Sequence, residues 1–79
     1  MVREGANVQA SAVIHAGPGL TTDIGASATV GHNSVVHGAI LEAECLVANG
    51  SVVLDGATIG ARALVAAGSV IAAGTTVPP

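Results

Sequence analysis

The sequence predicts an all-β fold, a parallel β-helix of about four to five triangular coils that forms a single domain over residues 1–79. Two observations predict it. A large aliphatic residue recurs every six positions through most of the chain, and a small residue stands two positions before it, on the same side of a strand. The large series consists of Val2, Val8, Ile14, Ile24, Val30, Val36, Leu41, Val47, Val53, Ile59, Val65, Ile71 and Val77.

A six-residue period is typical of short strands joined by tight turns, and it does not match the 3.6-residue period of a helix. Three strands close one triangular coil, and successive coils stack at about 4.8 Å. The large side chains are predicted to fill the interior, while the small ones leave room for the chain to turn. Glycines that directly follow a large aliphatic residue are expected to let the corner backbone bend; these are Gly25, Gly31 and Gly60.

The period is broken at two places. The spacing of ten residues between Ile14 and Ile24 predicts that the residues between them bulge outward as a loop. The spacing of five residues between Val36 and Leu41 predicts a tightened corner at Gly38.

Composition excludes several classes of function. The chain has no aromatic residue for base stacking, and its net charge of −3 with only Arg3 and Arg62 as cations excludes nucleic acid as a partner. The longest apolar stretch, residues 63–74, is too short for a membrane-spanning helix, so no membrane partner is expected. The single cysteine, Cys45, forms no intrachain disulfide, which favours a cytoplasmic location, and it belongs to the small interior series.

Three histidines are candidates for metal binding. His15 and His37 follow the third strand of consecutive coils, so they are expected to share one outward column in which they can converge on an ion. His32 falls at the corner between the second and third strands, on another edge of the prism. It is expected to reach the ion bound by His15 and His37 of a neighbouring chain. Three histidines with an open water position are typical of catalytic zinc.

The same strand face carries an outward apolar strip, which favours association. A three-fold ring would bury this strip and bring each chain's His32 to its neighbour's His15 and His37. We therefore predict a homotrimer with metal sites shared between subunits. The strip consists of Val13, Val35, Val52, Leu54, Val70 and Ala72.

Three segments carry a resemblance to a known family: GHNSVVHG at 31–38, SVVLDGATIG at 51–60 and LVAAGSVIAAGTTVPP at 64–79. The chain resembles the γ-class carbonic anhydrases, which are left-handed β-helices of hexapeptide repeats. The resemblance implies left-handed coils, and Zn²⁺ at each subunit interface held by His15, His32 and His37, with His32 donated by the adjacent chain. Fe²⁺ and Co²⁺ also accept imidazole ligands.

The activity implied by the resemblance is that of a lyase, the reversible hydration of CO₂ to bicarbonate by zinc-bound hydroxide. Gln9, in the run Asn7-Val8-Gln9-Ala10, matches the family glutamine that orients the zinc-bound solvent, so it is the predicted catalytic residue. Ala10 replaces the family aspartate, and the loop after His15 has no acidic residue before Asp23 to act as the family's proton shuttle.

The family's N-terminal coils and C-terminal helix also have no counterpart, so the chain resembles a form truncated at both ends. We expect carbonic anhydrase activity to be weak or lost. Two alternatives remain open: a hexapeptide-repeat acyltransferase with one histidine as general base between subunits, and a non-catalytic, metal-stabilised trimeric scaffold. The other charged residues, including Asp55 in the turn pair Asp55-Gly56, are expected to serve turns and solubility.

Overall fold

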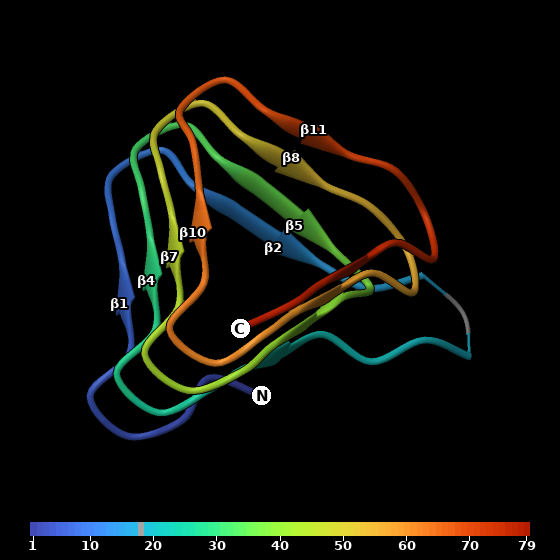
Figure 1. Cartoon of the computed structure of the whole chain (residues 1–79), viewed down its shortest axis with the longest axis horizontal. Helices are drawn as coiled ribbons and strands as arrows, with labels where there is room; N and C mark the ends of the chain where they lie inside the picture. Colours follow the sequence, from blue (N-terminus) through green and yellow to red (C-terminus); the bar gives the residue numbers. More distant parts are fainter. Residues whose placement is uncertain (18) are drawn as a thin grey trace.

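The computed structural model describes residues 1–17 and 19–79, and these wind into a parallel β-helix. Figure 1 shows the three-sided outline, with one labelled sheet on the left side, another at the upper right and both termini near the remaining side. This confirms the predicted fold class. Pro18, within the predicted loop, lies outside the described residues.

Each side of the prism is a parallel sheet to which every coil contributes one strand. The first sheet consists of β1 (Asn7–Val8), β4 (Thr29–Val30), β7 (Leu46–Val47) and β10 (Leu64–Val65). The second consists of β2 (Val13–His15), β5 (Val35–His37), β8 (Val52–Val53) and β11 (Val70–Ile71). The third consists of β3 (Asp23–Ile24), β6 (Ile40–Leu41), β9 (Thr58–Ile59) and β12 (Thr76–Val77).

The core is the stack of large aliphatic residues that the period predicts. Strand register places each of them directly above the next, as in Val8, Val30, Val47 and Val65 of the first sheet. Residues of the small series pack beside them, and the buried hydroxyls among these bond to backbone carbonyls, as Ser34 does to Ala48 at 3.0 Å. The large core side chains are Ile24, Val30, Val36, Leu41, Val47, Val53, Ile59 and Val65.

The N-terminal coil is an exception to this pattern. Val2 and Val8 are predicted interior residues, yet their side chains are exposed by 53% and 38%. The reason is that this coil is covered by a neighbouring coil on one side only, as the single bridge from Val2 to Ile24 illustrates.

Glycine is required after the large residues for a different reason from the one predicted. A Cβ at Gly31 would lie 2.4 Å from the Asn49 Oδ1 atom, and one at Gly60 would lie 2.6 Å from the Pro79 nitrogen. Close approach of the next coil, rather than a bend, therefore requires glycine there. Left-handed backbone occurs elsewhere in the corners, at Gly5, Ser11, Gly19, Ser27, Asn33, Gly38, Glu44, Gly50, Gly56, Arg62, Gly68 and Gly74.

Both predicted irregularities position the candidate site. The corner between β5 and β6 is shortened at Gly38, which has a φ of +61°. The longer connection between β2 and β3 lies beside this corner. A Cβ at Gly38 would lie 3.2 Å from the Cδ1 atom of Leu20, which belongs to that connection. In the described part of the chain, no helix has the length and apolar character needed to cross a bilayer.

Stacking of the coils predicts a large difference between two leucines of the same coil. Leu41 is fully buried, whereas Leu46 points outward from β7 and is 40% exposed. We expect Leu41→Ala to lower the free energy of unfolding by about 2–5 kcal/mol, because it leaves a cavity between coils. Leu46→Ala is the matched control and should cost much less. Denaturation followed by far-UV circular dichroism, at one protein concentration, measures both; equal losses would contradict this assignment of the core.

Candidate functional site

Two histidines stand one above the other at the end of the second sheet. His15 is the last residue of β2 and His37 the last of β5, and the two are register partners. Their ring centroids are 4.5 Å apart, and the His15 Nδ1 atom lies 2.6 Å from the His37 Nε2 atom. The predicted shared column is confirmed.

An aspartate that sequence reasoning missed extends this column. The Nδ1 atom of His37 is hydrogen-bonded to the Oδ1 atom of Asp55, which lies in the next coil, two residues after β8. We call His15, His37 and Asp55 the imidazole row. Solubility and turn formation were the roles predicted for Asp55, and the structure adds a specific contact to them. Its signal in the sequence is weak, because coil alignment places Asp55 opposite Gly38 rather than opposite His37.

Gly38 makes room for this contact. A Cβ at Gly38 would lie 2.7 Å from the Asp55 Oδ1 atom, and the residue has the left-handed backbone that glycine adopts without strain. The backbone N–H of Gly56 in turn donates to the Gly38 carbonyl at 2.9 Å. The shortened corner thus holds the aspartate against the His37 ring.

Thr22 joins the ends of the two histidine-bearing strands. Its buried hydroxyl donates to the His15 carbonyl at 2.5 Å and accepts the Gly38 N–H at 2.8 Å. The Gly38 N–H also donates to the His15 carbonyl, at 2.8 Å. These bonds fix the spacing between the two backbones, so the imidazole pair stands on a rigid base.

Both arginines are engaged in ion pairs of their own. Arg3 makes a bidentate pair with Asp23, at 2.9 and 2.8 Å, and this hydrogen bonding lowers the pKa of the Asp23 carboxyl. Arg62 lies 3.5 Å from Glu44 on another corner. Asp55 is therefore the charged group in contact with the imidazole pair, and both side chains of that contact are partly open to solvent, 31% for His37 and 45% for Asp55.

His32 and Gln9 lie at the opposite end of the same sheet, in the corners that precede β5 and β2. His32 is exposed, and its backbone N–H donates to the Asn49 Oδ1 atom at 2.8 Å. Within one chain, the structure brings His15 and His37 together but leaves His32 and Gln9 apart from them. The described residues contain no group of three His, Cys, Asp or Glu side chains that could hold a metal ion. The three-histidine site remains a prediction that requires a second chain.

The second sheet presents its predicted apolar strip between these two ends. Val13 and Val70 are exposed by 51% and 68%, while Val35 and Val52 are half-buried by their neighbours in the stack. The imidazole row therefore borders an apolar face of the prism.

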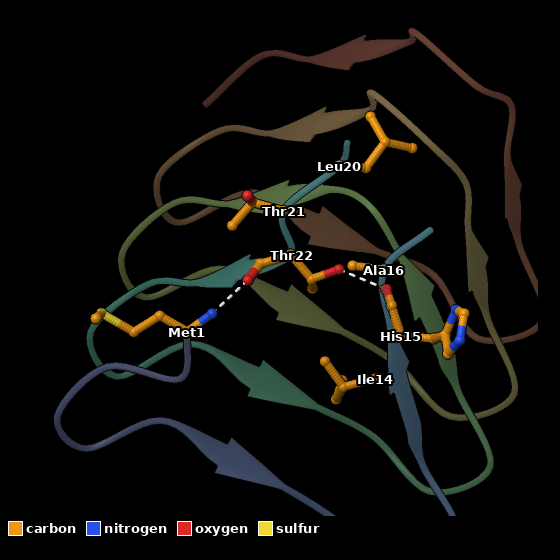
Figure 2. A pocket seen from close by; sticks show the side chains of 7 residues that line it. All are labelled: Met1, Ile14, His15, Ala16, Leu20, Thr21 and Thr22. Atoms are coloured by element: carbon orange, nitrogen blue, oxygen red, sulfur yellow. Dashed lines mark hydrogen bonds between the residues drawn. The ribbon is translucent and has the colours of Figure 1, made fainter. Parts of the chain in front are cut away.

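A pocket of about 310 Å³ lies inside the loop that precedes β3. Figure 2 shows that Thr22 bridges toward His15 in its wall, and that the His15 ring points away from Met1 and Thr21. The pocket therefore adjoins the imidazole row through His15, which contributes to both. It is lined by Met1, Ile14, His15, Ala16, Leu20, Thr21 and Thr22.

Comparisons with known proteins identify the repeat. The profile described as bacterial transferase hexapeptide (six repeats) matches residues 38–73. A solved structure from Bacillus cereus, described as a candidate acetyltransferase, superposes with a TM-score of 0.93 at 35% sequence identity, over 95% of this chain and 44% of that chain. Residues 38–73 carry the hexapeptide repeat of that transferase family. The repeat and the superposition agree with left-handed coils.

One curated relative is similar over part of the repeat. The carnitine operon protein CaiE of Escherichia coli O157:H7 is 36% identical over 54 residues, which are 68% of this chain and 28% of that protein. The hexapeptide-repeat chain thus spans less than half the length of either protein. These similarities support the repeat and the left-handed β-helix, and they do not single out the γ-class carbonic anhydrases.

Burial of Cys45 predicts an unreactive thiol. Desolvation raises its pKa from 9.0 to about 11. At pH 8 we expect the folded protein to react with a thiol reagent about 100-fold more slowly than the chain unfolded in denaturant, because the thiolate fraction falls in that proportion. Equal labelling rates for folded and unfolded chains would contradict this burial of the thiol.

The free energy of unfolding should also decline as the pH rises from 9.0 toward 11, since the unfolded chain releases the thiol proton first.

Proposed function

We propose that this chain forms the core of a trimeric hexapeptide-repeat acyltransferase, in which the imidazole row supplies the general base for acyl transfer from a thioester to a hydroxyl or amine. The observation that carries the proposal is the hydrogen-bonded row of His15, His37 and Asp55 on the outward side of the second sheet. The family of the repeat and the similarity to a candidate acetyltransferase support the same class of reaction.

Acyl transfer requires the imidazole row to supply a general base. An acceptor O–H or N–H attacks the thioester carbonyl, a C–O or C–N bond forms, and the C–S bond breaks. A neutral imidazole accepts the acceptor's proton during attack and returns it to the departing thiolate, which leaves as a thiol. A histidine suits this exchange because its protonation equilibrium lies near neutral pH. Asp55, hydrogen-bonded to His37, orients the imidazole pair.

Trimer formation would complete the site. Hexapeptide-repeat transferases commonly form trimers, and the exposed Val13 and Val70 mark the second sheet as the face to bury. His32 and the imidazole row lie at opposite ends of that sheet. A three-fold arrangement on this face would bring the His32 end of one subunit toward the imidazole row of the next.

A second candidate is metal-dependent hydration of CO₂, and one specific observation favours it. The ring nitrogens of His15 and His37 face each other, and moving them apart from 2.6 Å to about 3.3 Å would let both bind one tetrahedral ion as neutral imidazoles. These two would hold a zinc ion together with His32 from another subunit. The ion would supply a bound hydroxide as nucleophile, and Gln9 would orient it.

Acyl transfer can be tested with short acyl thioesters and a panel of hydroxyl and amine acceptors, with product detected by mass spectrometry. We expect His15→Ala to lower kcat by about 100-fold or more, the usual contribution of a general base. Glu4→Gln is the control, because Glu4 is exposed on a different corner. Absence of acyl product with every donor and acceptor in the wild-type trimer would refute the proposal.

Native mass spectrometry of protein purified without chelator decides between the two candidates. The acyltransferase predicts three chains and no bound metal. Three chains with three zinc ions, lost in His32→Ala, would instead support the shared three-histidine site and justify a CO₂ hydration assay. A monomer under native conditions would contradict both candidates.

A further inference from the structure

We propose that the Nε2 atom of His15 is the proton-accepting atom of the imidazole row, and that Asp55 and His37 are positioning residues that determine this choice. The inference rests on the proposed acyl transfer for its catalytic meaning. Its structural part, the direction of each hydrogen bond in the row, stands on the contacts alone.

The direction is set at the Asp55 end of the row. An ionised carboxylate only accepts hydrogen bonds, so the contact between Asp55 Oδ1 and His37 Nδ1 requires the proton to be on Nδ1. A neutral imidazole carries one ring proton. The Nε2 atom of His37 is therefore left with a lone pair.

The second contact then follows from the first. His37 Nε2 lies 2.6 Å from His15 Nδ1, which is hydrogen-bonding distance, and one of the two nitrogens must supply the proton. Because His37 Nε2 has none, His15 Nδ1 donates. The remaining nitrogen of His15, Nε2, carries the free lone pair.

Solvent access favours the same atom. His15 is exposed, whereas His37 is half-buried with one ring nitrogen bonded to Asp55 and the other to His15. Both nitrogens of His37 are thus engaged, and an acceptor molecule can approach the row at His15 without breaking a hydrogen bond.

The row also stabilises the proton once it has been taken up. When His15 Nε2 accepts the proton of the attacking hydroxyl or amine, the ring becomes positively charged. Its Nδ1–H bond to His37 becomes charge-assisted, and the Asp55 carboxylate lies on the far side of His37. The proton then passes from His15 Nε2 to the departing thiolate, which restores the neutral row.

The test is the tautomeric state of each histidine, read by long-range ¹H–¹⁵N NMR of protein labelled with ¹⁵N-histidine. Protein dialysed against a chelator and undialysed protein are both measured. We expect His15 and His37 to hold their proton on Nδ1 in both samples. The chain unfolded in denaturant is the reference, because its three solvated imidazoles should each show the mixture of tautomers typical of free histidine.

Asp55→Ala removes the group that sets the direction. We expect the Nδ1–H preference of both His37 and His15 to fall toward the mixture seen in the unfolded chain, and kcat to fall by about 10–100-fold with little change in KM. Glu4→Gln removes a carboxylate elsewhere and should leave the spectra unchanged. Circular dichroism identifies a variant that is unfolded; Asp55→Asn, which has the same size, should then also lose the Nδ1–H preference, because its amide NH2 can donate to His37 Nδ1.

A proton on Nε2 of either His15 or His37 in the wild type would overturn the inference, and so would spectra that Asp55→Ala leaves unchanged. The inference would also fail if both facing nitrogens lacked a proton until chelator was added, since that result indicates a bound metal. The spectra need no thioester, so they separate the two proposals. The expected tautomers without turnover would refute acyl transfer alone, whereas turnover with other tautomers would refute the role of His15 Nε2 alone.

Discussion

Parallel pairing between coils, repeated every six residues, is the constraint on which the rest of the structure depends. Each two- or three-residue strand is too short to be stable alone, and it is held because the coils above and below satisfy its backbone groups and cover its inward side chain. In-register stacking places residues of the same type above one another. Valines stack on valines in the core, small residues stack on small residues, and His15 stacks on His37 at the surface. The imidazole pair is a direct consequence of this register.

Departures from the period account for the chemistry at one corner. The shortened connection at Gly38 admits the Asp55 carboxylate, and Thr22, at the end of the longer connection, bonds to both histidine-bearing strands. A carboxylate and two imidazoles in a row make a directional hydrogen-bonded system, in which the group at one end determines which nitrogen is free at the other.

The period, the three sheets and the shared column of His15 and His37 were predictable, since strand alternation and coil stacking are geometric rules that act on sequence spacing alone. The role of Asp55 was not, because its contact depends on a side chain reaching from a corner to a ring one coil away. The need for glycine at positions 31 and 60 was likewise misassigned. Approach of the next coil's backbone requires it there, and that distance is set only when the coils are stacked.

The sequence by itself determined the solenoid, because its hydrophobic period places every Val, Ile and Leu of the large series on the inward side of a six-residue repeat, and it determined which histidines share a face. Tertiary structure alone decided how far each coil is covered, with Val2 and Val8 left partly exposed at one end. It also decided which polar atoms meet. A hydrogen bond requires its two heavy atoms to lie within about 3 Å of each other. The sequence period places each strand in its coil, but it does not determine which side-chain atoms come within that distance.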